Sequence, residues 1–301
     1  MIMTAGFVGL GHMGNPMARN LIKNQVKLLV YNRTKEKAFP LLKEGAEFVE
    51  SPQELFQKTS ILFSMVSNDE ALKEVTLGPK GLLENEKPGS IHVSMSTVSP
   101  ALIHDLRIQH QKKGITLLSE PVFGRPDAAK EQKLWICLGG ESEAKNRVLP
   151  LLLFMGQKVF DFGETPEAAN AVKLAGNFLI LSNVEILSEA FAFIQKSGGN
   201  LAAFNTMIGE ALLPSPIVKG YGKRVLDRDF KEGGFRMELG LKDINLLLQS
   251  ADSARVPMPI ATLLHNRLLS GIAKDRGYLD WSAIFFSAFE DAGLRDSSST
   301  Q

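Results

Sequence analysis

The chain has a single cysteine, almost no excess charge and no long apolar run. Because Cys137 is the one cysteine among 301 residues, no disulfide can form within the chain, and a reducing, cytoplasmic compartment is expected. The 34 basic and 33 acidic residues leave a formal net charge of +1, which argues against nucleic acid or an anionic membrane as the main partner. We expect no run long enough to cross a bilayer and no basic-then-apolar leader at the start of the sequence. We expect no metal site, and we expect Cys137 to be buried in a strand.

The first half of the chain alternates short apolar runs with helical patterns. Strands are expected at residues 6–9, 27–31, 61–65, 90–93, 116–119, 134–139 and 159–162. Helical patterns between them include residues 35–43, 70–74 and 100–113. Strands that alternate with helices predict βαβ units and a mainly parallel sheet.

From about residue 164 the strand patterns vanish, and long helices follow one another. They are expected at residues 167–197, 200–212, 235–255, 260–273 and 281–292, with breaks that contain glycine or proline. The first of these helices is about 45 Å long at 1.5 Å per residue. Because apolar residues surround much of its circumference, we expect it to run between two domains or between two subunits.

A G-x-G-x-x-G motif joins the first predicted strand to the first predicted helix. Its residues are Gly9, Leu10, Gly11, His12, Met13 and Gly14. The glycines permit a tight turn, a close approach of the backbone to a pyrophosphate, and close packing of helix on strand. The alternative is a glycine-rich turn without a ligand. The motif and the strand pattern together predict an α/β fold, with a Rossmann-like dinucleotide-binding domain over residues 1–163. An all-helical domain over residues 164–301 follows, joined to it by the long helix.

The turn after the second predicted strand indicates which dinucleotide is bound. An acidic residue at that position binds the ribose 2′-hydroxyl of NAD, but this chain has Asn32, followed by Arg33 and Thr34. Asparagine does not repel a 2′-phosphate, and an arginine offers it a forked donor. The turn therefore predicts NADP(H) as the cofactor, unless its charges serve only solvation.

Several motifs, in order, resemble the β-hydroxyacid dehydrogenases. They lie at residues 7–18, 94–100, 120–124, 170–177 and 241–244, so the resemblance covers almost the whole chain. It implies a Rossmann-like domain joined by a long helix to a helical domain. It also implies a nicotinamide cofactor, a small carbonyl or hydroxy acid as substrate, and a homodimer or homotetramer.

Lys173 and Asn177 are the expected catalytic pair. They lie four residues apart in the long predicted helix, so they project from one face. A lysine beside a nicotinamide can give a proton to the carbonyl oxygen as hydride reaches the carbon. The resemblance assigns Lys173 as the acid/base and Asn177 as its helper. The alternative is a solvated lysine and a structural asparagine.

The remaining candidates rest mainly on the resemblance. Substrate-binding candidates are Ser96, Thr97, Gly124, Arg125 and Lys242, and further cofactor-binding candidates are Met65, Val66, Ser67, Thr97, Phe235 and Lys242. Ser96 and Thr97 could instead cap a helix, Lys242 could pair with Asp243 at the surface, and Phe235 could be a core residue. Many members of the family carry Ser-Gly-Gly where this chain has Phe123, Gly124 and Arg125. Arg125 could receive a carboxylate there, or pair with Asp127 and bind nothing.

These observations favour an NADPH-dependent reductase of a short aldehyde acid, of the glyoxylate or succinic semialdehyde type. A second hypothesis is oxidation of 3-hydroxyisobutyrate or another 3-hydroxy acid with NAD(P). The turn at Asn32 argues against the NAD-linked form of this hypothesis. A third is a protein that binds NADP without catalysis. The presence of Lys173 argues against that third hypothesis.

Overall fold

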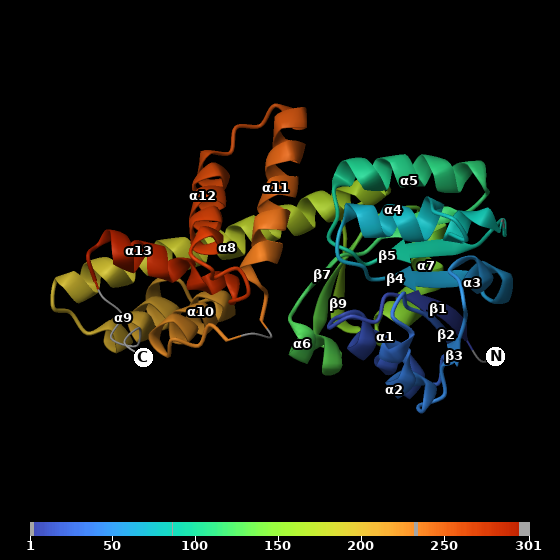
Figure 1. Ribbon diagram of the computed structural model, residues 1–301, viewed down its shortest axis with the longest axis horizontal. Helices are drawn as coiled ribbons and strands as arrows, with labels where there is room; N and C mark the ends of the chain where they lie inside the picture. The colour runs from blue at the N-terminus through green and yellow to red at the C-terminus, as the bar shows by residue number, and fades with distance from the viewer. Residues whose placement is uncertain (1–2, 86, 232–233, 295–301) are drawn as a thin grey trace. The chain divides into compact units, whose positions relative to one another are not determined.

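The computed structural model describes residues 3–85, 87–231 and 234–294, and the chain divides after Lys173 into two compact units (Figure 1). The first unit is built on a six-stranded parallel sheet in the order β3-β2-β1-β4-β5-β6, the strand order of doubly wound dinucleotide-binding folds. Its strands are β1 (Thr4–Val8), β2 (Lys27–Tyr31), β3 (Glu47–Phe48), β4 (Ile61–Ser64), β5 (Ile91–Ser94) and β6 (Thr116–Ser119). Apart from β3, these strands are mostly buried, which is why they read as short continuous apolar runs.

Helices cover both faces of this sheet. They are α1 (Gly14–Lys23), η1 (Lys35–Ala38), α2 (Phe39–Leu42), α3 (Gln53–Lys58), α4 (Asp69–Leu77), η2 (Leu82–Glu84) and α5 (Pro100–Lys112). In Figure 1, α4 and α5 lie on one side of the strands, and α1 and α2 lie on the other. Phe7 on β1 and Phe63 on β4 stack at the centre of the core, with ring centroids 6.2 Å apart.

A small second sheet completes the first unit. It has the order β7-β8-β9, from β7 (Val122–Phe123), β8 (Leu134–Leu138) and β9 (Gly156–Asp161). β7 and β8 pair antiparallel, and β8 and β9 pair parallel. Helices α6 (Pro126–Lys130) and α7 (Ser142–Leu152) connect these strands. Cys137 is buried on β8, as expected.

The second unit is helical in its described part. It contains most of α8 (Pro166–Lys196), then α9 (Leu201–Met207), the π-helical turn η3 (Ile208–Leu212), α10 (Pro216–Leu226), α11 (Met237–Ala254), α12 (Pro259–Ala273), η4 (Trp281–Ile284) and α13 (Phe285–Asp291). Phe191, Leu264, Trp281 and Phe285 are buried in one core. The predicted fold class, a Rossmann-like domain followed by a helical domain, is confirmed.

Helix α8 corrects one expectation from the sequence. By length and composition it could cross a membrane, so the expectation that no segment is long enough was wrong. Isolated polar residues such as Lys173 interrupt the apolar run without making the whole segment polar. Half of the apolar window is buried inside the structure, and the core helix of a soluble protein passes the same test.

Candidate active site

The glycine-rich loop after β1 is shaped by contacts that exclude a side chain. Gly9 has φ of +90°, and a Cβ there would lie 2.2 Å from the carbonyl oxygen of Met65. A Cβ on Gly14 would lie 1.9 Å from the carbonyl oxygen of Gly9. A Cβ on Gly11, in contrast, would meet no protein atom within 4 Å. Gly9 and Gly14 therefore hold the loop together, while Gly11 leaves its surface open to a ligand.

The loop leads directly into the N-terminus of α1. Met13 stands at the N-cap position without a side-chain cap, and the first turn of this helix contains no acidic residue. Within the loop, Leu10 is buried and His12 is exposed. An uncapped helix N-terminus presents backbone N–H groups and a partial positive charge, which suits a pyrophosphate. The loop therefore fits a dinucleotide.

Asn32 holds this loop to the turn after β2. Its Oδ1 accepts a hydrogen bond of 2.8 Å from the backbone N–H of Leu10, and its Nδ2 donates to the carbonyl oxygen of Thr34 at 2.7 Å. Arg33 and Thr34 are exposed. Thr34 precedes η1, but its hydroxyl does not cap that helix. The turn thus places a guanidinium and a hydroxyl in solvent beside an amide, with no carboxylate at the end of β2.

The buried hydroxyl of Ser96 connects the loop after β5 to the loop after β4 by a hydrogen bond. Ser96 is fully buried, and its Oγ accepts a hydrogen bond of 2.9 Å from the backbone N–H of Val66. Thr97 is half-buried, whereas Ser67 is exposed and Met65 is half-buried. Ser96 therefore supports the loop that carries Met65, Val66 and Ser67, and its neighbour Thr97 is better placed to reach a ligand.

A buried amide connects the start of α8 to the end of the large sheet. Asn170 donates a hydrogen bond of 2.6 Å to the Ser119 hydroxyl and accepts one of 3.5 Å from the backbone N–H of Val98. The next residue after Ser119 is Glu120, whose fully buried carboxyl has no hydrogen-bond partner among the described residues. Burial raises the pKa of Glu120 well above its usual range, so the neutral carboxylic acid is the favoured form. The sequence motif contained Asn170, but its spacing did not show this positioning role.

Lys173 lies one turn further along α8 and is only 7% exposed. Its Nζ lies over the ring of Phe123 on β7, 4.0 Å from the ring centroid. Burial raises the pKa of the nearby Cys137 thiol to about 11, although the charge of Lys173 opposes that shift. Gly124 is exposed and Arg125 is half-buried at the start of α6. The structure therefore gathers Lys173, Phe123, Gly124 and Arg125 around β7.

Two of the predicted site residues, Asn177 and Lys242, lie within the second unit. Asn177, four residues after Lys173 in the same helix, donates a hydrogen bond of 2.6 Å to Oδ2 of Asp243 on α11. Asp243 is 2% exposed, and its Oδ1 lies 3.0 Å from Nζ of Lys242. The predicted alternative of a surface Lys–Asp pair is wrong for the carboxylate, because Asp243 is buried. Sequence reasoning missed Asp243 as the residue that positions both Asn177 and Lys242.

Phe235 is half-buried and packs edge-on against the Trp281 ring, with centroids 4.6 Å apart. Its backbone N–H donates to Asp280, and its carbonyl accepts from the N–H of Trp281. These contacts favour a structural role within the second unit. A cofactor contact for Phe235 stays a prediction.

A buried chain of hydrogen bonds runs from α5 through β5 to the end of β4. His110 Nδ1 donates to the Leu106 carbonyl, which can only accept, so His110 Nε2 accepts from His92 Nδ1 at 2.9 Å. His92 Nε2 in turn accepts from the Ser64 hydroxyl at 2.8 Å. Burial lowers the pKa of His110 to about 4 and that of His92 well below its usual range. Both rings are therefore neutral and fix the end of β4.

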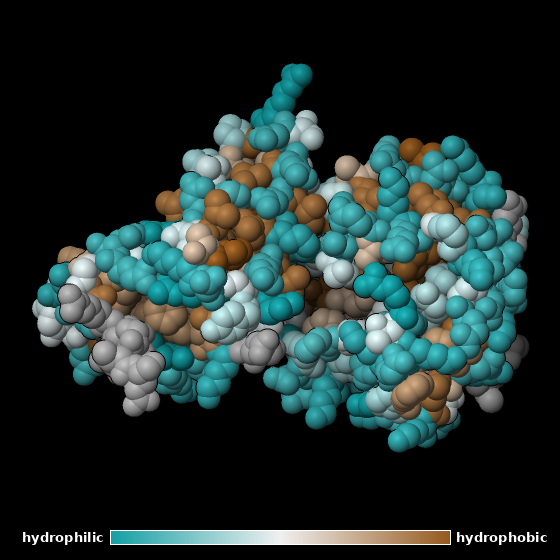
Figure 2. Space-filling view, in the orientation of Figure 1, coloured by the Kyte–Doolittle hydropathy of each residue, from teal (hydrophilic) through white to brown (hydrophobic). Residues whose placement is uncertain are grey.

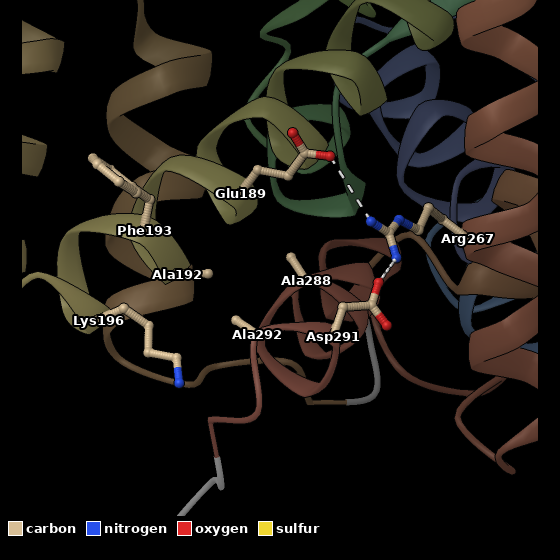
Figure 3. A pocket seen from close by; sticks show the side chains of 8 residues that line it. All are labelled: Glu189, Ala192, Phe193, Lys196, Arg267, Ala288, Asp291 and Ala292. Carbon is tan, nitrogen blue, oxygen red and sulfur yellow. Dashed lines mark hydrogen bonds and ion pairs between the residues drawn. The ribbon is translucent and has the colours of Figure 1, made fainter.

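A hollow in the second unit, shown in Figure 3, is not part of this site. It is lined by Glu189, Ala192, Phe193, Lys196, Arg267, Ala288, Asp291 and Ala292. Arg267 there pairs with Glu185, Glu189 and Asp291, so the charges serve to join α8, α12 and α13. Glu189 follows Lys173 by 16 residues in α8, which is about 24 Å along the helix axis. Among the described residues, no group of three or more His, Cys, Asp or Glu side chains could hold a metal ion.

Comparison with known proteins identifies the family. Residues 4–163 match the NAD-binding domain of 6-phosphogluconate dehydrogenase, and residues 168–286 match the NAD-binding domain of NADP-dependent 3-hydroxyisobutyrate dehydrogenase. The chain is 41% identical over 282 residues to the oxidoreductase YfjR of Bacillus subtilis, covering 94% of this chain and 98% of that protein. The chain belongs to the β-hydroxyacid dehydrogenase family. It is accordingly an NAD(P)-dependent oxidoreductase that binds a nicotinamide dinucleotide.

Two further relatives of this β-hydroxyacid dehydrogenase extend the comparison. It is 31% identical to the 2-hydroxy-3-oxopropionate reductase of Escherichia coli over 282 residues, covering 94% of this chain and 96% of that protein. Its fold is similar to that of the 3-hydroxyisobutyrate dehydrogenase of Salmonella typhimurium, with a TM-score of 0.82, 24% identity, and coverage of 95% of this chain and 99% of the other.

Proposed function

We propose that this β-hydroxyacid dehydrogenase is an NADPH-dependent reductase of a small aldehyde acid, with Lys173 as the general acid. The observation that carries the proposal is the burial of Lys173 in α8, at the end of the unit that also contains the glycine-rich loop. A lysine with little access to water, in a dinucleotide-binding family, is suited to proton transfer rather than to solvation.

The proposed cofactor is NADP(H), and a bound nicotinamide would supply the hydride. The N–H groups at the start of α1 would receive the pyrophosphate, and the open surface at Gly11 would let it approach. Arg33 and Thr34 would receive the 2′-phosphate. Loop residues Met65, Val66 and Ser67, with Thr97, would line the dinucleotide, while Ser96 would hold that loop in place. Contacts from Phe235 and Lys242 complete the predicted set.

The proposed substrate carries an aldehyde and a carboxylate on one short carbon chain, as glyoxylate and succinic semialdehyde do. Thr97, Gly124, Arg125 and Lys242 are the proposed carboxylate contacts, with Asn177 holding the substrate near Lys173. The 2-hydroxy-3-oxopropionate reductase supports this class, because its name describes reduction of a small oxo acid. The family model over residues 168–286 favours a second candidate, the oxidation of 3-hydroxyisobutyrate with NADP.

We further propose residues 1–163 as the dinucleotide-binding domain, residues 164–301 as the substrate and oligomerisation domain, and the cytoplasm as the place of action. A homodimer or homotetramer is supported by an apolar stripe on α8. Leu179, Ile186 and Phe193, spaced by seven residues, are 59%, 60% and 70% exposed. Figure 2 shows apolar patches on the surface of this helical unit. Residues at this spacing share one helix face, which is suited to packing against a second copy.

The test is a panel of aldehyde acids and 3-hydroxy acids assayed with NADPH and NADH by nicotinamide absorbance. We expect the highest kcat/KM for an aldehyde acid with NADPH. Lys173→Ala should lower kcat by about 10² to 10⁴ while NADPH still binds. The control is Lys196→Ala, near the end of the same helix, which should leave kcat unchanged. A Lys173→Ala enzyme with normal kcat would refute the proposed mechanism, and a preference for 3-hydroxyisobutyrate would favour the second candidate.

A further inference from the structure

The residue beneath the proposed general acid is an aromatic side chain. Phe123 stands where many members of the family carry the serine of Ser-Gly-Gly, and its ring faces Nζ of Lys173 at 4.0 Å from the centroid. This distance is well within the range of about 6 Å in which a ring face attracts a cation.

The small sheet fixes the position of this ring. Phe123 is directly opposite Trp135 in the antiparallel pair of β7 and β8, so the two side chains lie on the same face. The Trp135 ring contacts the Phe160 ring on β9, with centroids 5.8 Å apart. After Phe123 the chain turns at Gly124, where φ is +143° and a Cβ would lie 2.6 Å from Leu134. Phe123 is therefore held on a short, constrained strand rather than on an adaptable loop.

The ring matters because Lys173 has lost most of its water. An ammonium group with little solvent access is less stable in its charged form, and an aromatic face compensates through its quadrupole. The titratable and charged groups on the surrounding segments are Glu120 before β7, Arg125 after it, Cys137 on β8, and Lys158 and Asp161 on β9. Burial favours the uncharged forms of Glu120 and Cys137, and the face of the Phe123 ring adds a fixed negative potential toward Nζ.

We propose that Phe123 is a positioning residue that holds Lys173 as an ammonium, aimed for proton donation. This rests on the proposed role of Lys173 as the general acid. In the reduction, the Nζ–H bond breaks, the proton joins the carbonyl oxygen, and Lys173 is left as a neutral amine that regains a proton from water. Phe123 favours the state before this transfer, in which Nζ carries its proton and stays centred over the ring.

The test compares Phe123→Leu, which keeps an apolar side chain without a ring, with Phe123→Tyr, which keeps the ring. Two quantities are measured: the titration of Lys173 in the free protein by NMR of labelled lysine, assigned with Lys173→Arg, and the pH profile of kcat. The matched control is Phe48→Leu, which removes a ring of the large sheet that lies over Lys35 instead. A melting curve for each variant shows that it is folded.

We expect Phe123→Leu to move the Lys173 titration to lower pH by about one unit, which is tenfold in the proton affinity of Nζ. The alkaline limb of kcat should move with it, whereas Phe123→Tyr and Phe48→Leu should leave the titration in place. An unchanged titration in Phe123→Leu, or an equal shift in Phe123→Tyr, would overturn the inference. A shifted titration with an unshifted kcat profile would uphold the ring contact and refute Lys173 as the general acid.

Discussion

Replacing Arg33 should separate the two nicotinamide cofactors without harming the fold. The guanidinium is exposed, and the described residues offer it no ion-pair partner, so its removal should cost little stability. A charge-assisted hydrogen bond to a phosphate contributes roughly 1.5–3 kcal/mol, but water screens pairs at an exposed turn. We therefore expect Arg33→Gln to lower kcat/KM for NADPH by about tenfold, the lower end of that range.

Arg33→Asp should go further and favour NADH, because the carboxylate repels a 2′-phosphate and can accept from a 2′-hydroxyl. The matched control is Lys37→Gln, which removes an exposed cation from the following turn and should change the NADPH value much less. The measurement is kcat/KM for each cofactor at a saturating, fixed concentration of the best aldehyde acid. Equal losses for NADPH and NADH in Arg33→Gln, or no loss for either, would refute the assignment of the phosphate to this turn.

The structure also explains why Arg33, rather than Asn32, is the position to change. Asn32 accepts from the N–H of Leu10 and donates to the carbonyl of Thr34. An aspartate could keep the first hydrogen bond, but it has no proton for the second and would face the carbonyl oxygen with a negative charge. Asn32→Asp should therefore distort the turn and weaken binding of both cofactors.

Three further predictions test other parts of the site. Gly11→Ala should leave Tm unchanged, since a Cβ there meets no protein atom, but it should raise the Kd for NADPH measured by calorimetry. Gly14→Ala should lower Tm, because its Cβ would overlap the Gly9 carbonyl. Equal effects of the two substitutions would contradict the loop geometry. Asp243→Asn should lower kcat by about tenfold with a normal circular dichroism spectrum, because Asp243 is both the buried acceptor for Asn177 and the ion-pair partner of Lys242. An unchanged kcat would show that Asn177 needs no such support. The free energy of unfolding should fall as pH drops from about 6.5 to about 4, because in this range His110 binds a proton in the unfolded chain but stays neutral when buried. Denaturant titrations should show a loss on the order of 3 kcal/mol, and a smaller loss in His110→Gln. A free energy of unfolding that does not change with pH would contradict the neutral histidine chain.

The sequence predicts the strands and helices correctly where their apolar pattern extends over enough residues. All seven predicted strands appear near their predicted positions in the two sheets, since buried strands leave short apolar runs between helices. β3 and β7 were missed because two residues carry no periodicity. Helix α10 was also missed, because Gly220 and Gly222 lower its helix propensity. It forms nevertheless, since Ser215 caps it and Val218 and Val225 are buried.

The predicted helix over residues 200–212 also differs from the structure, for a similar reason. α9 ends at Met207 and passes into a π-helical turn over Ile208–Leu212, so the chain keeps its helical sense with a different hydrogen-bond spacing. Residues 281–292 likewise form a 3₁₀ turn followed by α13, because Asp280 caps the turn at Ser282. Hydrophobic spacing alone does not separate these helix types.

The candidate site was readable only in part, because spacing shows which residues share a face but not which partners they choose. Ser96 and Asn32 stood in the right motifs, yet both use their side chains to hold backbone N–H groups of neighbouring loops. Asp243 looked like half of a surface ion pair until its burial was known. Polar residues in such motifs can either hold a loop or reach a ligand. The sequence does not distinguish these roles, whereas the hydrogen bonds in the structure identify the residues that hold loops.

Helix α8 contains both members of the proposed catalytic pair, and each member is held by contacts within its own unit. Lys173 ends the first compact unit, and Asn177 belongs to the second. The helix is continuous from Pro166 to Lys196, and residues four apart in a helix lie about 6 Å from each other on one face. Asn170 anchors this helix to the large sheet, and Asp243 anchors Asn177 to α11. The spacing of the proposed catalytic pair is thus set by backbone hydrogen bonds of one helix, and each unit supplies the contact that orients its own member of the pair.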